Sequence, residues 1–162
     1  MKTTYKVSII GILTALYVVL SAFLKFNIFG NIMIDLGYVA FAVALCFFGP
    51  IGTVVGVIGC MLESLLFSAY GLSVSWMAAN LTIGLICGFA FIKIDNVWIR
   101  IVIGIVSVLI GMLGIKTVIE CSLYGIPLAV KIPKNAVAFA VDSVTLTAGI
   151  LFSNILKKKV SV

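Results

Sequence analysis

Long uncharged runs separated by short polar segments form the main pattern of this chain. The runs cover residues 7–24, 36–62, 64–92, 101–115 and 135–156. A bilayer core is ~30 Å thick, and a helix needs ~20 residues to cross it. A β-barrel is excluded, because its strands alternate polar and apolar positions whereas these runs are continuously apolar. The pattern therefore predicts membrane-spanning helices.

The second run is long enough for two helices and contains a turn signal. In Gly49-Pro50-Ile51-Gly52, the proline is placed where it opens a helix. A split at this point predicts six helices. They are expected near 7–24, 36–48, 51–69, from Ser73 or Ser75 onward, 98–121 and 133–156. The outer connections at 25–35 and 122–132 are then long, and they form either a lid or passive connectors.

Composition supports a single transmembrane domain over residues 1–162. Hydrophobic residues make up 64% of the chain and charged residues 10%, and the mean hydropathy is +1.36. A soluble domain is about 45–50% apolar and about 25% charged, so almost nothing is left for one here. We therefore expect an all-α integral membrane protein, folded as a compact bundle of six transmembrane helices.

The basic residues set the expected orientation in the membrane. Lys2 and Lys6 lie near the N-terminus, and three lysines at 157–159 lie near the C-terminus. Because positive residues favour the cytoplasmic side, we expect both termini in the cytoplasm and an even number of spans. The net charge of +6 follows from this topology and does not indicate a nucleic-acid partner.

Several polar residues lie in or beside the apolar runs, and the expected topology puts them in the outer half of the membrane. They are Glu63, Asn80, Lys116, Glu120 and Asp142. A charge near the bilayer centre costs ~2.5–3.5 kcal/mol, so such residues persist mostly in pockets, pathways or helix contacts. Together they predict a binding site open to the outside. Trp76 and Tyr124 either belong to an interfacial aromatic belt or stack on a planar ligand.

Structural roles for these polar residues are open alternatives. Lys116 and Glu120 are spaced i, i+4, so they either pair with each other or contact a ligand. Glu63 and Asp142 have no local partner, and a pair between Lys116 and one of them would be structural. A buried carboxylate needs a cation, a donor network or a proton. We therefore expect at least one of the two to bind the ligand.

The sequence argues against catalysis and metal binding. It has no histidine, and its four cysteines form no C-x-x-C pair, so no metal site and no cofactor are expected. It also has no nucleophile elbow and no glycine-rich phosphate loop, so we predict that the chain is not an enzyme. Any active transport must take its energy from another subunit or from an ion gradient.

Small residues one helical turn apart form flat faces that allow close helix contact. Such pairs are Gly11/Ala15, Gly52/Gly56 and Gly84/Gly88. The last two are interpreted as packing within the bundle. The first helix is the most uniformly apolar one, so Gly11 and Ala15 are the candidates for contact with a partner protein.

Three stretches carry a resemblance to a known family. They are Lys6–Ser21, Asp35–Gly56 with its Gly-Pro turn, and Ile132–Asp142. In this order and spacing they are similar to the first helix, to the second helix with the start of the third, and to the start of the last helix of one family. That family is the S component, the substrate-binding membrane subunit, of energy-coupling factor (ECF) transporters. The resemblance covers nearly the whole chain.

The resemblance implies a bundle in the cell membrane that captures a vitamin or related micronutrient from outside. It also implies assembly with a coupling transmembrane protein and two cytoplasmic ATPases. In the family, small residues on the first helix contact the coupling protein. Gly11 and Ala15 match that spacing, although Gly11 departs from the usual alanine.

The resemblance also suggests a ligand. Family members often have an asparagine near the ligand in the last helix, where this chain has Asp142. This difference suggests a ligand with hydrogen-bond donors or positive charge, and Glu63 and Glu120 point the same way. A 7-deazaguanine precursor of queuosine suits this logic best. Thiamine, a pyridoxine-like ligand, folate and riboflavin remain alternatives.

Two functions of other classes also remain. A stand-alone secondary carrier would use Glu63 or Asp142 as a proton relay, although we see no internal repeat of the kind that many carriers have. A structural membrane protein would bind no ligand, and it would tolerate Glu63→Gln and Asp142→Asn.

Overall fold

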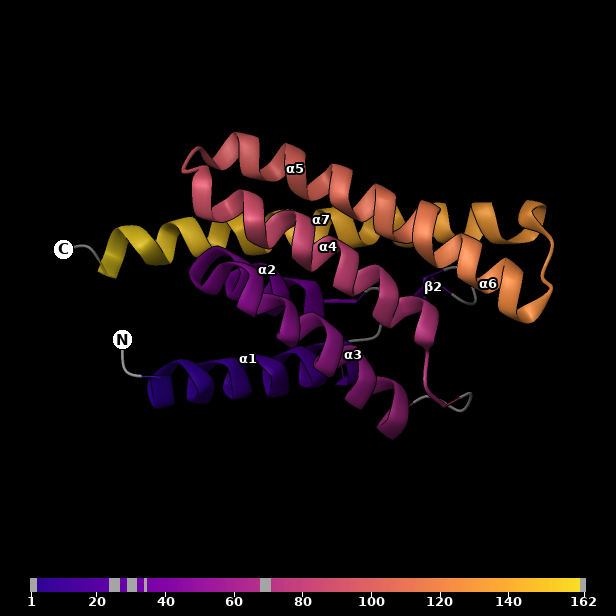
Figure 1. Cartoon of the computed structure of the whole chain (residues 1–162), viewed down its shortest axis with the longest axis horizontal. Helices are drawn as coiled ribbons and strands as arrows, with labels where there is room; N and C mark the ends of the chain where they lie inside the picture. The colour runs from indigo at the N-terminus through magenta and orange to yellow at the C-terminus, as the bar shows by residue number, and fades with distance from the viewer. Residues whose placement is uncertain (1–2, 24–26, 29–31, 34, 68–70, 161–162) are drawn as a thin grey trace.

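The computed structural model describes residues 3–23, 27–28, 32–33, 35–67 and 71–160, and this part of the chain is mostly helical (Figure 1). The elements in chain order are α1 (Thr3–Phe23), β1 (Asn27–Ile28), β2 (Ile32–Met33), α2 (Gly37–Phe48), the 3₁₀-helix η1 (Gly49–Gly52), α3 (Thr53–Phe67), α4 (Val74–Lys93), α5 (Val97–Leu109), the π-helix η2 (Ile110–Lys116), α6 (Thr117–Tyr124) and α7 (Leu128–Val160). The short strands β1 and β2 pair antiparallel, with Asn27 opposite Met33. Elements α5, η2 and α6 follow one another without a break, so they form one long helical rod.

Five stretches of the described residues are long and apolar enough to cross a membrane. They are Thr4–Ala22, Gly37–Phe67, Val74–Lys93, Val97–Tyr124 and Leu128–Lys159. The all-helical, multi-pass character expected from the sequence is therefore present. The six-span count stays a prediction, because α2 and α3 together make up one of these five stretches.

The stretch from α2 to α3 folds back on itself at η1, where the sequence predicted a turn. Gly49 has φ +59°, a backbone conformation that favours glycine. A Cβ added to Gly52 would lie 2.5 Å from the carbonyl oxygen of Ala44, and one added to Gly56 would lie 2.6 Å from the ring of Phe41. Because residues after the turn meet residues before it in reverse order, α2 and α3 pack antiparallel.

Both termini lie at the same end of the bundle, which we call the terminal end (Figure 1). The turn at η1 also lies near this end, because the Lys157 ammonium near the end of α7 is 5.5 Å from the centre of the Phe47 ring. The opposite end, where α6 meets α7, is called the loop end. This arrangement agrees with termini on one side of the membrane, and their location in the cytoplasm stays a prediction.

The long connection expected at 122–132, either a lid or a passive connector, is much shorter than expected. Helix α6 continues to Tyr124 and α7 begins at Leu128. Gly125, at φ +61°, ends α6, and the carbonyl oxygen of Pro127 accepts hydrogen bonds from the amides of Val130 and Lys131. The helix thus starts around Pro127 rather than at Pro133, which lies inside α7 and removes a single backbone donor.

The other long connection, expected at 25–35, is described in part. Asn27 lies in β1, and Asp35 is buried just before α2. Phe26 and Asn31, which the sequence placed in this connection, lie outside the described residues. A lid role for this segment therefore stays a prediction.

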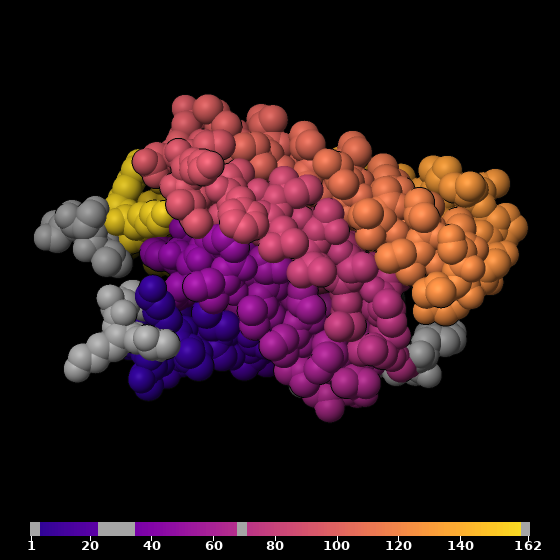
Figure 2. Space-filling view, viewed as in Figure 1, coloured from indigo at the N-terminus to yellow at the C-terminus, as the bar shows by residue number. Residues whose placement is uncertain are grey.

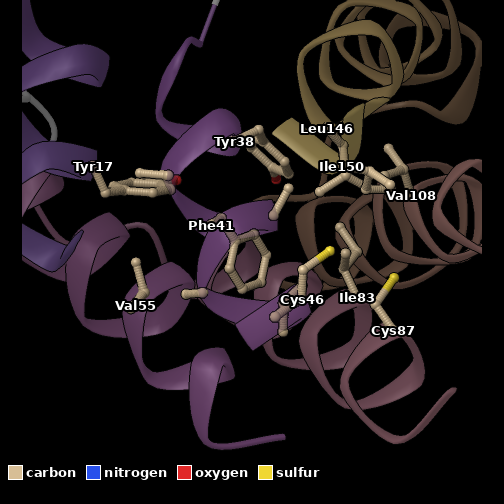
Figure 3. Close-up of a cluster of buried hydrophobic side chains, with 14 of the residues drawn as sticks. Tyr17, Tyr38, Phe41, Cys46, Val55, Ile83, Cys87, Val108, Leu146 and Ile150 are labelled. Atoms are coloured by element: carbon tan, nitrogen blue, oxygen red, sulfur yellow. The ribbon is translucent and has the colours of Figure 1, made fainter. Parts of the chain in front are cut away.

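Helix α2 lies at the centre of the core (Figure 3). Its residues Ala40, Phe41 and Ala42 are almost fully buried although they point in different directions around a twelve-residue helix. A helix that is apolar on all sides is buried on all sides, and α1, α3, α4 and α7 surround α2. Figure 3 shows Ile83 of α4, Val108 of α5, and Leu146 and Ile150 of α7 on one side of it.

The outer surface of the bundle is apolar, as contact with lipid requires. Large exposed side chains include Ile12 of α1, Phe89 of α4, Val102 of α5 and Val144 of α7, all at least 60% exposed. Figure 2 shows the helices packed side by side along the long axis, with the region where α6 meets α7 projecting at the loop end. Helix α1 lies at the edge, where most of its residues face outward.

The contact between α4 and η1 predicts that the stability of the protein depends on the glycine at position 88. A Cβ at Gly88 would lie 2.7 Å from Cα of Pro50, which belongs to a rigid turn. We expect Gly88→Ala to lower the free energy of unfolding by about 1–3 kcal/mol, because α4 must move away. The measurement is thermal unfolding in detergent, followed by a thiol-reactive dye that labels the buried Cys46, Cys60 and Cys87 on unfolding.

The matched control is Gly114→Ala, because a Cβ at Gly114 meets nothing within 4 Å. This variant should be as stable as the parent or slightly more stable. Equal melting temperatures for the two variants would contradict the close contact between α4 and η1.

Candidate functional site

Buried polar side chains from five helical elements and from the residue before α2 gather in one region of the bundle, which we call the polar cluster. Its members are Tyr17 and Ser21 of α1, Asp35 before α2, Tyr38 of α2, Trp76 and Asn80 of α4, Lys116 of η2 and Asp142 of α7. Most of them are at least nine-tenths buried, and Trp76 is partly buried. Polar groups inside a membrane bundle need internal partners, so their partners show what the region can do.

Asp35 joins α1 to the start of α2. Its Oδ1 accepts hydrogen bonds from the Ser21 hydroxyl at 2.5 Å and from the backbone amide of Gly37 at 2.8 Å. Its Oδ2 accepts one from the Tyr17 hydroxyl at 3.4 Å. The three donors compensate for the burial of this carboxylate, and they fix α1 against α2.

Asn80 joins α4 to three other elements. Its Oδ1 accepts a hydrogen bond from the Tyr38 hydroxyl at 2.5 Å. Its Nδ2 donates to the carbonyl oxygen of Gly56 at 3.2 Å and to the Tyr17 hydroxyl at 3.4 Å. The hydroxyl ends of Tyr17 and Tyr38 point toward each other in Figure 3. The predicted ligand residue Asn80 is thus the centre of a network that links α1, α2, α3 and α4.

Lys116 lies against Trp76, and its charge also interacts with that of Glu120. Its ammonium nitrogen is 3.6 Å from the centre of the Trp76 ring, a cation–π contact, and the side chain is 4% exposed. The π-helix η2 ends at Lys116, and the Thr117 hydroxyl donates to the carbonyl oxygen of Met112, five residues earlier. Single π-turns in helices are often found at functional sites.

Glu120 is held by a separate group near the loop end, which we call the Glu120 clamp. Its carboxylate accepts from the ammonium of Lys131 at 3.0 Å, from Nδ2 of Asn135 at 3.2 Å and from the Ser75 hydroxyl at 3.4 Å. Asn135 also donates to the Thr117 hydroxyl at 2.9 Å. Among the described residues, Glu120 therefore pairs with Lys131 of α7, and its carboxylate is already in use.

Asp142 is the carboxylate of the polar cluster that lacks a complete set of partners. It is 2% exposed, and its Oδ2 has no hydrogen-bond partner among the described residues. It lies close enough to Lys116 and to Asp35 for their charges to interact. Leaving a buried acceptor unsatisfied costs about 1–3 kcal/mol or more, so such a group calls for an explanation.

Other buried side-chain atoms share this property. Nε1 of Trp76 and Oγ of Ser143 are buried without a hydrogen-bond partner in the described part of the chain. A donor of Trp76 and a carboxylate oxygen of Asp142 without partners thus occur within the polar cluster. Such a region can accept a small molecule that offers both donors and acceptors.

The structure brings some of the predicted site residues together and leaves others apart. Trp76, Asn80, Lys116 and Asp142 belong to the polar cluster, and Glu120 lies in the adjacent clamp. Tyr124 is 56% exposed at the end of α6. Glu63 is half-buried on α3. For all of them a role in ligand binding stays a prediction.

The sequence interpretation did not select Tyr17, Ser21, Asp35 or Tyr38 as site residues. A signal was present, because Tyr17 and Ser21 are spaced i, i+4 and lie on one side of the mostly apolar second half of this helix. Gly11 and Ala15, the predicted docking pair, lie on a different, exposed side of α1. A Cβ at Gly11 would meet nothing within 4 Å.

The polar cluster is closed in this structure. One shallow hollow on the bundle surface lies between α3 and α4, lined by residues such as Pro50, Val54 and Leu81, and another lies on α7 beside Val141. Both are apolar and face outward, and neither is lined by a residue of the polar cluster. Among the described residues, no group of three or more His, Cys, Asp or Glu side chains is placed to hold a metal ion.

Comparison with known proteins gives one family. The sequence model of the family described as "ECF-type riboflavin transporter, S component" matches residues 1–157. A crystal structure of the S component for biotin from an ECF-type ABC transporter has the same fold, with a TM-score of 0.69. The sequence identity is 17%, and the similarity covers 98% of this chain and 95% of that one.

The Glu120 clamp predicts a stability effect that is separate from ligand binding. Asn135 is 1% exposed and donates to both Glu120 and Thr117. We expect Asn135→Ala to lower the free energy of unfolding by about 1–3 kcal/mol, because it removes one buried donor from both Glu120 and Thr117. Thermal unfolding in detergent measures this effect. Lys134→Ala, at an exposed position one residue earlier, should leave the melting temperature unchanged, and a similar loss in both variants would argue against the clamp.

Proposed function

Because the chain belongs to the family of ECF-type riboflavin transporter S components, we propose that it captures a planar heterocyclic micronutrient for uptake through the membrane. An S component is a transporter subunit and not an enzyme. The observation that carries the proposal is the pair formed by Asp142, with its unpartnered Oδ2, and Lys116, stacked on Trp76. This arrangement offers a carboxylate, an ammonium and an aromatic face at one buried place.

The chemistry of this pair narrows the ligand. Asp142 suits a donor such as a ring N–H, Lys116 suits a carbonyl oxygen, and Trp76 suits a flat ring. Riboflavin and 7-deazaguanine precursors of queuosine both carry an N–H next to a carbonyl on one edge of a planar ring. The family match favours riboflavin as the first ligand to test. The queuosine precursor stays the second, ahead of thiamine, folate and pyridoxine-like compounds.

Glu63 and Tyr124 remain candidates for contacts at the edge of the site. Glu63 lies one turn before the end of α3, and Tyr124 lies at the end of α6. Both positions are toward the loop end, where a ligand from outside would enter if the termini are cytoplasmic. Because the polar cluster is closed, the ligand has to separate side chains on entry.

The partners proposed for the chain are a coupling transmembrane protein and two cytoplasmic ATPases, in the plasma membrane. Support for a docking surface comes from α1. Its outer side is exposed and apolar, with Val7 at 64% and Ile12 at 67% exposure, and the small residues Gly11 and Ala15 lie on the exposed surface. Small residues in such a place let the backbone of another helix approach closely.

The first experiment is a ligand panel tested by thermal unfolding of the purified protein. The panel contains riboflavin, 7-aminomethyl-7-deazaguanine, thiamine, folate and pyridoxamine. A ligand at ~100 times its dissociation constant should stabilise the protein by ~2.7 kcal/mol. Mass spectrometry of small molecules that co-purify with the protein identifies a ligand outside the panel. A protein that carries no small molecule and gains no stability would contradict the proposed function.

Asp142→Ala should abolish binding of the stabilising ligand while the protein stays folded. The reason is the loss of the carboxylate that faces the ligand, and we expect affinity to fall at least 100-fold in an equilibrium titration. Asp95→Ala is the matched control, because Asp95 is fully exposed in the α4–α5 turn. Unchanged affinity in the Asp142 variant would remove Asp142 from the site.

Gly11→Leu and Ala15→Leu should block uptake without changing affinity for the ligand. A large side chain on this side of α1 prevents close helix contact with the coupling protein, whereas the polar cluster is left as it is. The measurement is uptake of labelled ligand by cells that contain the whole transporter, with a parallel binding titration on the purified variants. Normal uptake would refute the docking role, and uptake by the purified chain alone in vesicles would favour a secondary carrier.

A further inference from the structure

An aromatic face and two carboxylates lie near the Lys116 ammonium in the interior of the bundle. In this structure it covers the face of Trp76 at 3.6 Å. It also lies close enough to the carboxylates of Glu120 and Asp142 for their charges to interact, and the Glu120 carboxylate already accepts from Lys131, Asn135 and Ser75. Because Asp142 Oδ2 has no partner among the described residues, it can receive the ammonium when the Trp76 face is needed for something else.

We propose that Lys116 occupies the ligand's place on Trp76 in the empty protein and moves to Asp142 when the ring of the ligand stacks on Trp76. The proposal rests on the proposed function and specifies how the same site accepts its ligand. Lys116 is therefore a positioning residue, which keeps the indole face covered until the ligand arrives.

The exchange is favourable because each step replaces one contact by another. The cation–π contact with Trp76 is lost when the ammonium leaves the indole face. An ammonium beside a buried carboxylate recovers comparable energy, and it satisfies an acceptor that is otherwise orphaned. The ring of the ligand then covers the indole in place of the cation.

The surroundings of Asp142 favour the arrival of a cation. Asp35 lies near enough for its charge to interact with that of Asp142. Asp35 already accepts hydrogen bonds from Ser21, Gly37 and Tyr17, so it does not need a further partner. An ammonium beside Asp142 reduces the repulsion between the two carboxylates.

The side chains also differ in stiffness in the way that this exchange requires. Lysine has a flexible four-carbon stem that can move its ammonium without moving the backbone. Trp76 is a rigid platform on α4, and Asp142 has a short side chain on α7. The moving part is therefore Lys116, and the helices can stay in place.

The exchange restricts the class of ligand. If Lys116 and Asp142 pair with each other in the bound state, their charges cancel. The best ligand is then a planar ring without net charge, which presents polar atoms to the pair at its edge. A phosphorylated ligand would find no uncommitted cation in the polar cluster.

The test is an NMR measurement on detergent-solubilised protein labelled with carbon-13 at the lysine ε-carbons. A group above an indole face is shifted upfield by the ring current, so the Lys116 resonance should lie upfield of those of the other lysines. Lys116→Arg identifies the resonance by its loss, and Trp76→Leu should return it to the ordinary position. Addition of riboflavin, or of the panel member that stabilises the protein, should remove the upfield shift.

A second measurement tests the destination of the ammonium by a double-mutant cycle. Affinity for the same ligand is compared among the parent, Lys116→Met, Asp142→Asn and the double variant. If the two side chains pair in the bound state, each single variant should lose affinity at least tenfold. The double variant should then lose at least tenfold less than the product of the single losses.

The outcomes separate this proposal from the proposed function. A ligand that binds while the Lys116 resonance stays upfield overturns the exchange and leaves the capture function intact. Multiplicative losses in the cycle overturn the pairing with Asp142. A protein that neither carries a small molecule nor binds any panel member overturns both proposals together.

Discussion

The hydrogen bonds around Asp35 and Asn80 determine which helices of this bundle are neighbours. Between apolar helices in lipid there is no hydrophobic driving force, because lipid tails are as apolar as leucine. Polar contacts therefore decide much of the arrangement. Through Ser21 and Tyr17, Asp35 ties α1 to α2, and Asn80 ties both of them to α4 and α3. The same network forms one wall of the candidate site, so the site and the fold depend on the same atoms.

Close contacts at glycine residues also hold neighbouring helices of the bundle together. Gly56 leaves room for the Phe41 ring, and Gly149 of α7 leaves room for Val39 and Ala42 of α2. As a result most of α2 is buried, with eight of its twelve residues in the buried interior. A short helix at the centre fixes the polar residues at its start, Asp35 and Tyr38, at a constant distance from α4 and α7. The glycines thus help to position the site without being part of it.

The sequence predicted the helices where local signals are strong and failed where tertiary contacts decide. The Gly-Pro turn at 49–52 is present, because proline and glycine restrict the backbone whatever surrounds them. Pro133, in contrast, lies inside α7, since the helix starts at Pro127 and continues through the missing donor. The π-turn before Lys116 left no clear local signal, and it accompanies the contact of Lys116 with α4. That contact also explains why the spacing of Lys116 and Glu120 did not produce an ion pair between them.

The sequence predicted several residues of the candidate site, but it did not predict the hydrogen bonds that they make. Trp76, Asn80, Lys116 and Asp142 stand out because polar residues are costly in apolar runs, whereas Asp35 looked like part of a loop. Which of these residues has a free hydrogen-bonding atom depends on neighbours far apart in the chain. Asn80 and Glu120 are satisfied inside the protein, and Asp142 keeps an oxygen without a partner. Helix α1 contributes Tyr17 and Ser21 to the site from one side and exposes Gly11 and Ala15 on another. A change in the polar cluster that moves α1 would therefore also move the proposed docking surface, because both lie on one rigid helix.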